Sequence, residues 1–193
     1  MFSQQVLQKI CDWVLSQTED KPYPYVLFLI GASGSGKTTM GRVLSEALHL
    51  PVVSFDEIAA IFSETNDERD GKYAGMVAHR VIYETGNLLT RGKSLILDET
   101  NTSGVHRRAL MQQIAMFNCN VTLLGLWLDT PLDVCVKRDV ARALPRGEGV
   151  YVTHRALYGR DGEFYQTTGL CPTVTSIGPD EFASLYRVGI EDQ

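Results

Sequence analysis

Eight consecutive residues, Gly31 to Thr38, have the types and spacing of a phosphate-binding loop, or P-loop. Its glycines allow successive backbone N–H groups to turn inward without a Cβ in the way. Lys37 is then placed to reach the β- and γ-phosphates of a nucleoside triphosphate, and the Thr38 hydroxyl is placed to ligate Mg²⁺. The motif predicts binding of ATP and Mg²⁺. The predicted nucleotide-binding residues are Gly31, Ala32, Ser33, Gly34, Ser35, Gly36, Lys37, Thr38 and Thr39.

The segments on both sides of this loop fit the predicted role. Residues 25–30 form an apolar run that predicts a buried strand directly before the loop. Apolar residues at helical spacing follow it, namely Met40, Val43, Leu44, Ala47 and Leu48. A glycine-rich turn that binds no ligand is the alternative, and this strand, loop and helix context argues against it.

Two carboxylates directly follow predicted strands. Asp98 ends an apolar run, the position of a carboxylate that holds Mg²⁺ or its waters, and Glu99 takes this role if the register differs by one. Asp56 directly follows the strand-like run 51–55 and is predicted to act as the general base that accepts a proton from an attacking hydroxyl. Its alternative role is the N-cap of a helix that begins at Glu57.

The residues after Asp98 are further candidates for the substrate site. Thr100 and Asn101 could orient the acceptor or the γ-phosphate, or they could form a turn or a helix cap. Arg107 and Arg108 could contact an acceptor phosphate or lie in solvent. The sequence leaves these alternatives open.

Two arginines in a later segment predict a lid over the phosphates. Arg138 and Arg142 are four residues apart and share a face if the segment is helical. A mobile segment, about residues 137–150, would bring their charge to the transferring group and exclude water, with Pro145 and Gly147 ending or kinking the helix. A solvated basic face is the alternative. Both arginines are predicted to be catalytic, with Arg138 also contacting the nucleotide.

Strand-like runs alternate with helical patterns, which is typical of a parallel sheet with helices on both faces. The predicted strands are 25–30, 51–55, 94–98, 121–128 and the more weakly patterned 173–177. Helical patterns between them include 73–89, 106–117 and 132–142. We expect an α/β, three-layer P-loop kinase fold of about five strands. The carboxyl ends of its strands would bring the P-loop, Asp56 and Asp98 together.

Composition favours one domain. The chain has 193 residues, and an apolar content of 44% is enough for one sizeable core. We expect residues 25–193 to form this domain, with residues 1–24 packing on it as a helix and linker. The polar segment 64–71 predicts a surface loop. The net charge of −5 gives no general attraction to nucleic acid, so such binding would need a local basic groove.

Cysteine spacing and hydropathy indicate a cellular compartment. The four cysteines are widely spaced, which favours thiols in a reducing environment over a zinc site. The N-terminus lacks a basic segment followed by an apolar core, and no run is long enough to cross a bilayer. We therefore expect a cytoplasmic protein without a membrane partner. The sequence does not indicate an oligomeric state.

The ordered motifs resemble the polynucleotide 5′-kinase-like family of P-loop kinases, which also includes zeta-toxin-like and small-molecule kinases. The matching segments are 31–38, 54–57, 97–101 with Arg107 and Arg108, and 136–142. The resemblance implies these roles: Lys37 and Thr38 on ATP and Mg²⁺, Asp56 as base, Asp98 or Glu99 near the metal, and Arg138 and Arg142 as lid arginines.

One position departs from the polynucleotide kinases, which carry an arginine three residues after the base to hold an acceptor phosphate. This chain has Ala59 there, and Arg107, Arg108 or Arg146 could take over that contact. The prediction is a Mg²⁺-ATP-dependent kinase with a hydroxyl acceptor, either the 5′-hydroxyl of a nucleic acid or a small metabolite, nucleoside or antibiotic. A non-kinase ATPase switch is a further alternative, although the guanine signature Asn-Lys-x-Asp of GTPases is missing.

Overall fold

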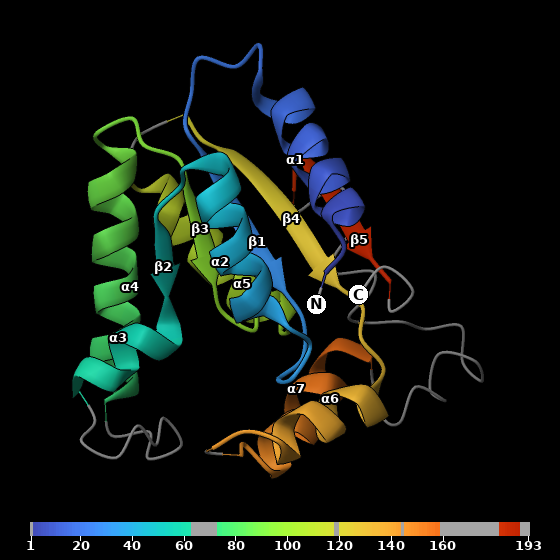
Figure 1. Cartoon of the computed structure of the whole chain (residues 1–193). Coiled ribbons are helices and arrows are strands. Elements are labelled where there is room, and N and C mark those ends of the chain that lie inside the picture. The colour runs from blue at the N-terminus through green and yellow to red at the C-terminus, as the bar shows by residue number, and fades with distance from the viewer. Residues whose placement is uncertain (1, 63–72, 118–119, 144, 159–181, 190–193) are drawn as a thin grey trace, which may run out of the picture.

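The computed structural model describes residues 2–62, 73–117, 120–143, 145–158 and 182–189. Their strands form one parallel sheet in the order β2-β3-β1-β4-β5 (Figure 1). The strands are β1 (Tyr25–Ile30), β2 (Val52–Ser54), β3 (Leu95–Asp98), β4 (Thr122–Leu128) and β5 (Ser184–Val188). The helices are α1 (Gln4–Thr18), α2 (Lys37–Leu48), α3 (Phe55–Phe62), α4 (Ala74–Leu89), α5 (Gly104–Ala115), α6 (Leu132–Val140) and α7 (Glu148–Tyr158).

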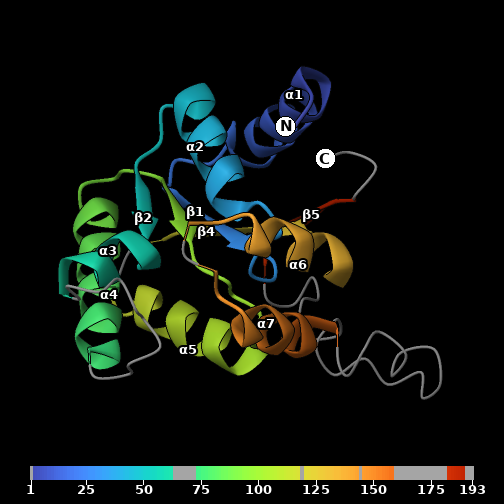
Figure 2. The same ribbon diagram turned by 60° about the horizontal axis from the view of Figure 1, so that its bottom comes forward.

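Alternate residues of β1 supply two separate cores, because successive side chains of a strand point to opposite faces of the sheet. Phe28 faces a cluster that includes residues of α3, α4 and α5. Leu27 and Leu29 face the other side, where they join buried residues of α1 and α2. Figure 2 shows α1 and α2 on one side of the sheet and α4 and α5 on the other. The predicted three-layer fold is confirmed.

The central strands were predicted closely, and the last strand was not. The run 25–30 is β1, and the predicted runs at 51–55, 94–98 and 121–128 contain β2, β3 and β4. The predicted strand 173–177 and the predicted loop 64–71 lie outside the described residues. The fifth strand is β5, which pairs with β4 from Leu124 to Leu128. Its residues Ser-Leu-Tyr-Arg-Val have no clean alternation and were not assigned from the sequence.

The helix after β4 is shorter than its pattern predicts. The predicted helix 132–142 ends at Val140, and the backbone N–H of Arg142 closes a turn onto the carbonyl of Asp139 (3.0 Å). Arg142 therefore does not share a helical face with Arg138, which corrects the interpretation from spacing. The chain continues through residues 141–147 into α7. Both α6 and α7 lie beyond the carboxyl ends of the strands (Figure 1).

Helix α1 is capped and packed on the sheet. The Ser3 hydroxyl accepts a hydrogen bond from the backbone N–H of Val6 (3.2 Å), the usual N-cap contact. Ile10 and Val14 are fully buried, and the Trp13 indole N–H donates to the Ser184 hydroxyl of β5 (3.0 Å). Among the described residues, no helix combines the length and the apolar character needed to span a membrane.

Candidate functional site

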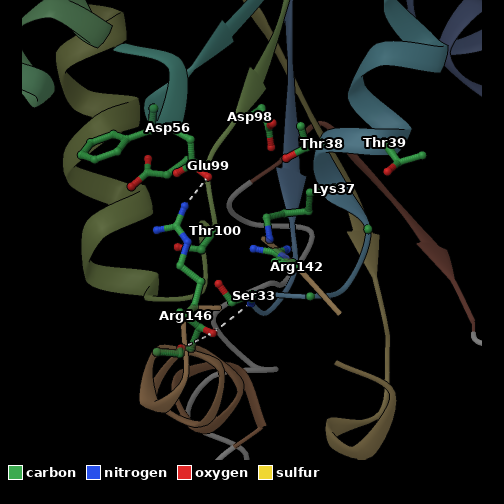
Figure 3. Close-up of a pocket in the computed structure, with 15 residues that line it drawn as sticks. Ser33, Lys37, Thr38, Thr39, Asp56, Asp98, Glu99, Thr100, Arg142 and Arg146 are labelled. Atoms are coloured by element: carbon green, nitrogen blue, oxygen red, sulfur yellow. Dashed lines mark hydrogen bonds and ion pairs between the residues drawn. The ribbon is translucent and has the colours of Figure 1, made fainter. Parts of the chain in front are cut away.

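A cavity of about 270 Å³ opens at the carboxyl edge of the sheet (Figure 3). The P-loop and the start of α2 form one wall. The ends of β2 and β3, with the residues that follow them, form the opposite wall, and α7 with the segment before it completes the cavity. Its lining residues are Ser33, Gly34, Gly36, Lys37, Thr38, Thr39, Phe55, Asp56, Asp98, Glu99, Thr100, Arg142, Arg146, Gly149 and Thr153.

Lys37 is held by its own loop. Helix α2 begins at this residue, and the Lys37 ammonium donates to the backbone carbonyls of Gly31 (2.8 Å) and Ala32 (2.9 Å). Burial lowers the pKa of Lys37 to about 8, although the nearby Asp98 and Asp56 carboxylates favour its charged form. The buried ammonium thus faces more desolvation than its carboxylate neighbours offset, and an anionic phosphate beside it would stabilise its charge.

Neighbouring elements brace the backbone of the P-loop. The Ser35 carbonyl accepts hydrogen bonds from the Thr130 hydroxyl (3.2 Å) and from the Arg138 guanidinium (3.1 Å). The Ser33 N–H donates to the Thr153 hydroxyl of α7 (2.9 Å). These contacts fix the loop from two helices and the segment after β4, so that its backbone is set before any ligand arrives.

Glycine is required at one position of the loop by both conformation and space. Gly34 has φ +85°, and a Cβ there would lie 2.4 Å from the carbonyl oxygen of Cys135 in α6. A side chain at this position would push the loop away from α6. This close approach allows α6 to pack directly against the backbone of the P-loop.

Asp98 and Thr38 offer oxygen ligands that suit Mg²⁺. Asp98 is buried, with 6% of its surface exposed, and accepts a hydrogen bond from the Thr38 hydroxyl. Burial raises the pKa of Asp98, while the Lys37 charge and the Thr38 hydrogen bond act in the opposite direction. A carboxylate and a hydroxyl beside the P-loop fit the preference of Mg²⁺ for oxygen ligands.

Glu99 is engaged elsewhere. Its carboxylate lies 2.8 Å from the His106 imidazole of α5, and this hydrogen bond raises the pKa of His106. Of the two carboxylates that the sequence offered for the metal, Asp98 is therefore the one beside Thr38. Glu99 lines the cavity on the side of Asp56.

Asp56 is not the cap of α3. The helix begins at Phe55, and the Ser54 hydroxyl accepts from the backbone N–H of Glu57 (3.3 Å) in the way a cap does. The Asp56 side chain is 55% exposed at the cavity, and its Oδ2 accepts a hydrogen bond from Arg146 Nη2 at 2.6 Å. The capping alternative is wrong, and the carboxylate is placed to meet a ligand.

Of the two predicted lid arginines, Arg142 lines the cavity and Arg138 does not. The Arg142 guanidinium lies beside Lys37 (Figure 3), where its charge contributes to lowering the pKa of Lys37. Arg138 instead hydrogen-bonds the P-loop carbonyl of Ser35. The two arginines thus meet the P-loop in different ways, Arg138 at a backbone carbonyl and Arg142 inside the cavity.

Of the candidates predicted after Asp98, one lines the cavity and three do not. Thr100 lines the cavity, whereas the Asn101 amide is buried and donates to the Leu29 carbonyl (2.9 Å), which ties β3 to β1. Arg107 is fully buried and donates to the Asn101 carbonyl (2.6 Å), and Arg108 is exposed outside the cavity. A substrate contact for Asn101, Arg107 or Arg108 is thus corrected to packing for the first two and a surface position for the third.

Some lining or bracing residues were missed as site candidates from the sequence, among them Thr153, Asp139 and Phe55. Thr153 is 120 residues from its partner Ser33, and Asp139 accepts from the Gly147 N–H (2.9 Å) behind the cavity. Phe55 lines the acceptor side and looks in the sequence like any strand-end residue. No local pattern marks Thr153, because it acts through a contact with a distant segment.

A model of the AAA_33 family, described as an AAA domain, matches residues 26–159. This match covers more than half of the chain and contains the P-loop, both carboxylates and the lid arginines. The chain belongs to the AAA_33 family. The P-loop of this AAA_33 domain lies in a P-loop kinase fold.

Curated relatives of this AAA_33 chain are shikimate kinases. One from Xanthomonas campestris pv. campestris is 28% identical over 94 residues, which is 44% of this chain and 52% of that protein. One from Nostoc sp. is 27% identical over 124 residues, 60% of each. The chain thus spans about half the length of the first of these relatives.

Solved structures support the fold. A protein assigned as a kinase from Chloroflexus aurantiacus matches with a TM-score of 0.63 at 19% identity, over 90% of each chain. A chain of the Pnkp1/Rnl/Hen1 RNA repair complex matches with a TM-score of 0.58 at 19% identity, over 77% of this chain and 48% of that one. At such identities the likeness shows the fold alone. The narrower resemblance to polynucleotide 5′-kinases is not confirmed.

Proposed function

We propose that this AAA_33 chain is an ATP-dependent kinase that phosphorylates a hydroxyl of a small molecule. The observation that carries the proposal is that one cavity has the P-loop lysine, Lys37, at one wall and the Asp56 carboxylate at the other. The Asp56 side chain is exposed and does not serve as a helix cap. Phosphoryl transfer needs these two parts, a cradle for the phosphates and a group that orients the attacking hydroxyl.

The phosphate side of the cavity would bind and position ATP. Lys37 would exchange its hydrogen bonds to the Gly31 and Ala32 carbonyls for contacts with phosphate oxygens, which better satisfy a buried ammonium. Arg142 would add a second positive charge next to Lys37. Thr38 and Asp98 would hold Mg²⁺, which when bound neutralises charge on the β- and γ-phosphates.

The acceptor side would orient the hydroxyl. The Asp56 carboxylate would accept a hydrogen bond from the hydroxyl, align it with the γ-phosphorus and take its proton late in the reaction. Thr100, which lines the same side, could supply a further hydrogen bond to the acceptor. Direct in-line transfer needs no phosphorylated enzyme.

A small acceptor is favoured over a nucleic-acid end by the missing clamp arginine at Ala59, by the acidic net charge and by the curated relatives, although Arg146 lines the cavity and can hold one anionic group. Ala59 stands where the polynucleotide kinases carry their phosphate clamp, and it is buried in the core. Arg107 is buried and Arg108 is outside the cavity. With a net charge of −5 the protein has no general attraction to a polyanion. The curated relatives, which are shikimate kinases, agree with a small acceptor.

The test is transfer from γ-labelled ATP in the presence of Mg²⁺. Sugar acids, sugar phosphates, nucleosides and shikimate would be compared with DNA and RNA oligonucleotides that carry a 5′-hydroxyl. We expect label on a small molecule and a loss of roughly 10²-fold in Asp56→Asn, the scale of removing a positioned base. Label confined to oligonucleotide ends would establish a polynucleotide kinase. ATP consumption that no acceptor stimulates and that Asp56→Asn does not change would establish a switch.

A further inference from the structure

We propose that Arg146 binds an anionic group of the acceptor, so that the natural acceptor carries a carboxylate or a phosphate in addition to its reactive hydroxyl. This inference rests on the proposed kinase function and specifies its substrate class. It assigns to Arg146 the acceptor contact that Ala59 cannot make.

Arg146 lies on the acceptor side of the cavity. Its guanidinium extends from the segment before α7 toward Asp56, whereas the Arg142 guanidinium lies beside Lys37 (Figure 3). Two arginines four residues apart thus serve different halves of one cavity. Of Arg107, Arg108 and Arg146, which the sequence offered as replacements for the missing clamp, Arg146 alone lines the cavity.

The backbone around Arg146 is already ordered. The Asp139 carboxylate accepts from the Gly147 N–H (2.9 Å), and the Arg146 carbonyl accepts from the Gly149 N–H (3.1 Å) at the start of α7. Asp139 is itself buried at the end of α6. An anion that meets Arg146 therefore has little of the segment left to order, which favours binding.

The ion pair between Arg146 and Asp56 indicates what the acceptor must offer. Arg146 Nη2 lies 2.6 Å from Asp56 Oδ2, so an acceptor whose hydroxyl donates to the Asp56 carboxylate also comes within reach of the Arg146 guanidinium. A neutral alcohol donates to Asp56 but offers the Arg146 guanidinium no charged partner, whereas a carboxylate or phosphate forms a charge-assisted hydrogen bond with it. A molecule with both a hydroxyl and an anion satisfies both side chains at once.

The same argument predicts selectivity against neutral analogues. A neutral ligand lacks the charge-assisted hydrogen bond that an anion forms with a guanidinium, and such a bond is roughly twice as strong as a neutral one. The Arg146 side chain is 27% exposed, so water compensates part of this loss. We expect a preference of about 10-fold to 10²-fold for the anionic member of a matched pair.

The experiment compares acceptors that differ only in their anionic group. Suitable pairs are gluconate and gluconamide, shikimate and its methyl ester, and a nucleoside 3′-phosphate and its nucleoside, both of which keep the 5′-hydroxyl; they also distinguish carboxylate from phosphate. In Arg146→Met we expect KM for the anionic member to rise by about 10-fold to 10²-fold and KM for ATP to stay unchanged. Arg146→Lys should recover part of the loss. Arg108→Met removes a matched surface arginine and should change neither KM.

A binding measurement separates this inference from the kinase proposal. Calorimetric titration of the same pairs, with a non-hydrolysable ATP analogue and Mg²⁺ present, reports acceptor binding without turnover. Anion binding that weakens in Arg146→Met supports the inference, and if transfer is absent in that case the kinase proposal alone fails. Equal use or binding of neutral and anionic members by the wild-type protein, an unchanged preference in Arg146→Met, or no binding of any anionic member would overturn the inference. Circular dichroism and melting of the variant confirm that it is folded.

Discussion

In the phosphate half of the cavity, burial and hydrogen bonds to the backbone hold Lys37 and the P-loop, whereas in the acceptor half an exposed ion pair joins two distant segments. Lys37 is buried and bonded within its own loop, and the loop is braced by Arg138, Thr130 and Thr153. Asp56, 55% exposed, meets Arg146 across 90 residues of sequence.

This difference indicates that substitutions in the phosphate half cost more stability than substitutions in the acceptor half. A buried, braced loop loses several contacts when one residue is altered, so its chemistry is fixed by the fold. An exposed ion pair contributes little to the free energy of folding. The residues that form it can therefore be substituted, so that the site accepts a different substrate, with little loss of stability. The P-loop is therefore a guide to the phosphate donor, and the side chains of the opposite wall are the guide to the acceptor.

Replacing Lys37 should produce the largest effect on activity. Lys37→Met removes the ammonium that would contact the transferring phosphate, and we expect the transfer rate to fall by about 10³-fold, the scale of losing a positioned donor to developing charge. The variant should remain folded, because methionine fills similar space. Steady-state transfer to the acceptor measures the loss, and unchanged turnover would remove the P-loop lysine from the mechanism.

Alanine substitutions at one glycine of each half should differ in their effect on the free energy of unfolding. Gly34→Ala combines a φ of +85° with a Cβ 2.4 Å from the Cys135 carbonyl, and we expect it to lower the free energy of unfolding by about 3 kcal/mol. Gly147→Ala, next to Arg146, has φ +56° but no heavy atom within 4 Å of its Cβ, and should cost about 1 kcal/mol. Urea unfolding measures both, and equal costs would contradict the description of a tightly braced phosphate half.

The ligand-free protein should become more stable as alkaline pH discharges Lys37. Its pKa is about 8 in the folded protein against 10.5 in the unfolded chain. Between these values the unfolded chain binds more protons, so the contribution of Lys37 to the free energy of unfolding rises with pH. We expect melting curves in chelator to show this rise in the wild-type protein relative to Lys37→Met from pH 8 to 10.5. A flat difference would mean that the ammonium is well solvated.

The smallest expected effect is that of the acceptor ion pair on stability. Arg146→Met and Asp56→Asn should each change the free energy of unfolding by about 1 kcal/mol or less, because solvent screens an ion pair with one partner more than half exposed. The wild-type value should also depend little on salt. Urea unfolding at low and high salt checks this, and a loss of several kcal/mol would show that the pair is structural.

The sequence predicted the layers of the fold because each strand carries its own apolar pattern. It predicted the edge at which the site forms for the same reason, since parallel strands end together. It failed where a residue is defined by a distant partner. Arg107 was predicted to contact an acceptor phosphate or to lie in solvent, but it is buried and donates to the Asn101 carbonyl. The spacing of Arg138 and Arg142 predicted one helix through both residues, but α6 ends at Val140, between them.

The sequence by itself determined the phosphate half of this protein. The glycines, the lysine and the threonine of the P-loop lie within eight residues, and their local backbone conformation creates the donor array. Only the tertiary structure decided the acceptor half. Asp56 and Arg146 belong to segments whose separate patterns say nothing of each other, and they meet because the packing of α6 and α7 beyond the sheet carries Arg146 to the end of β2.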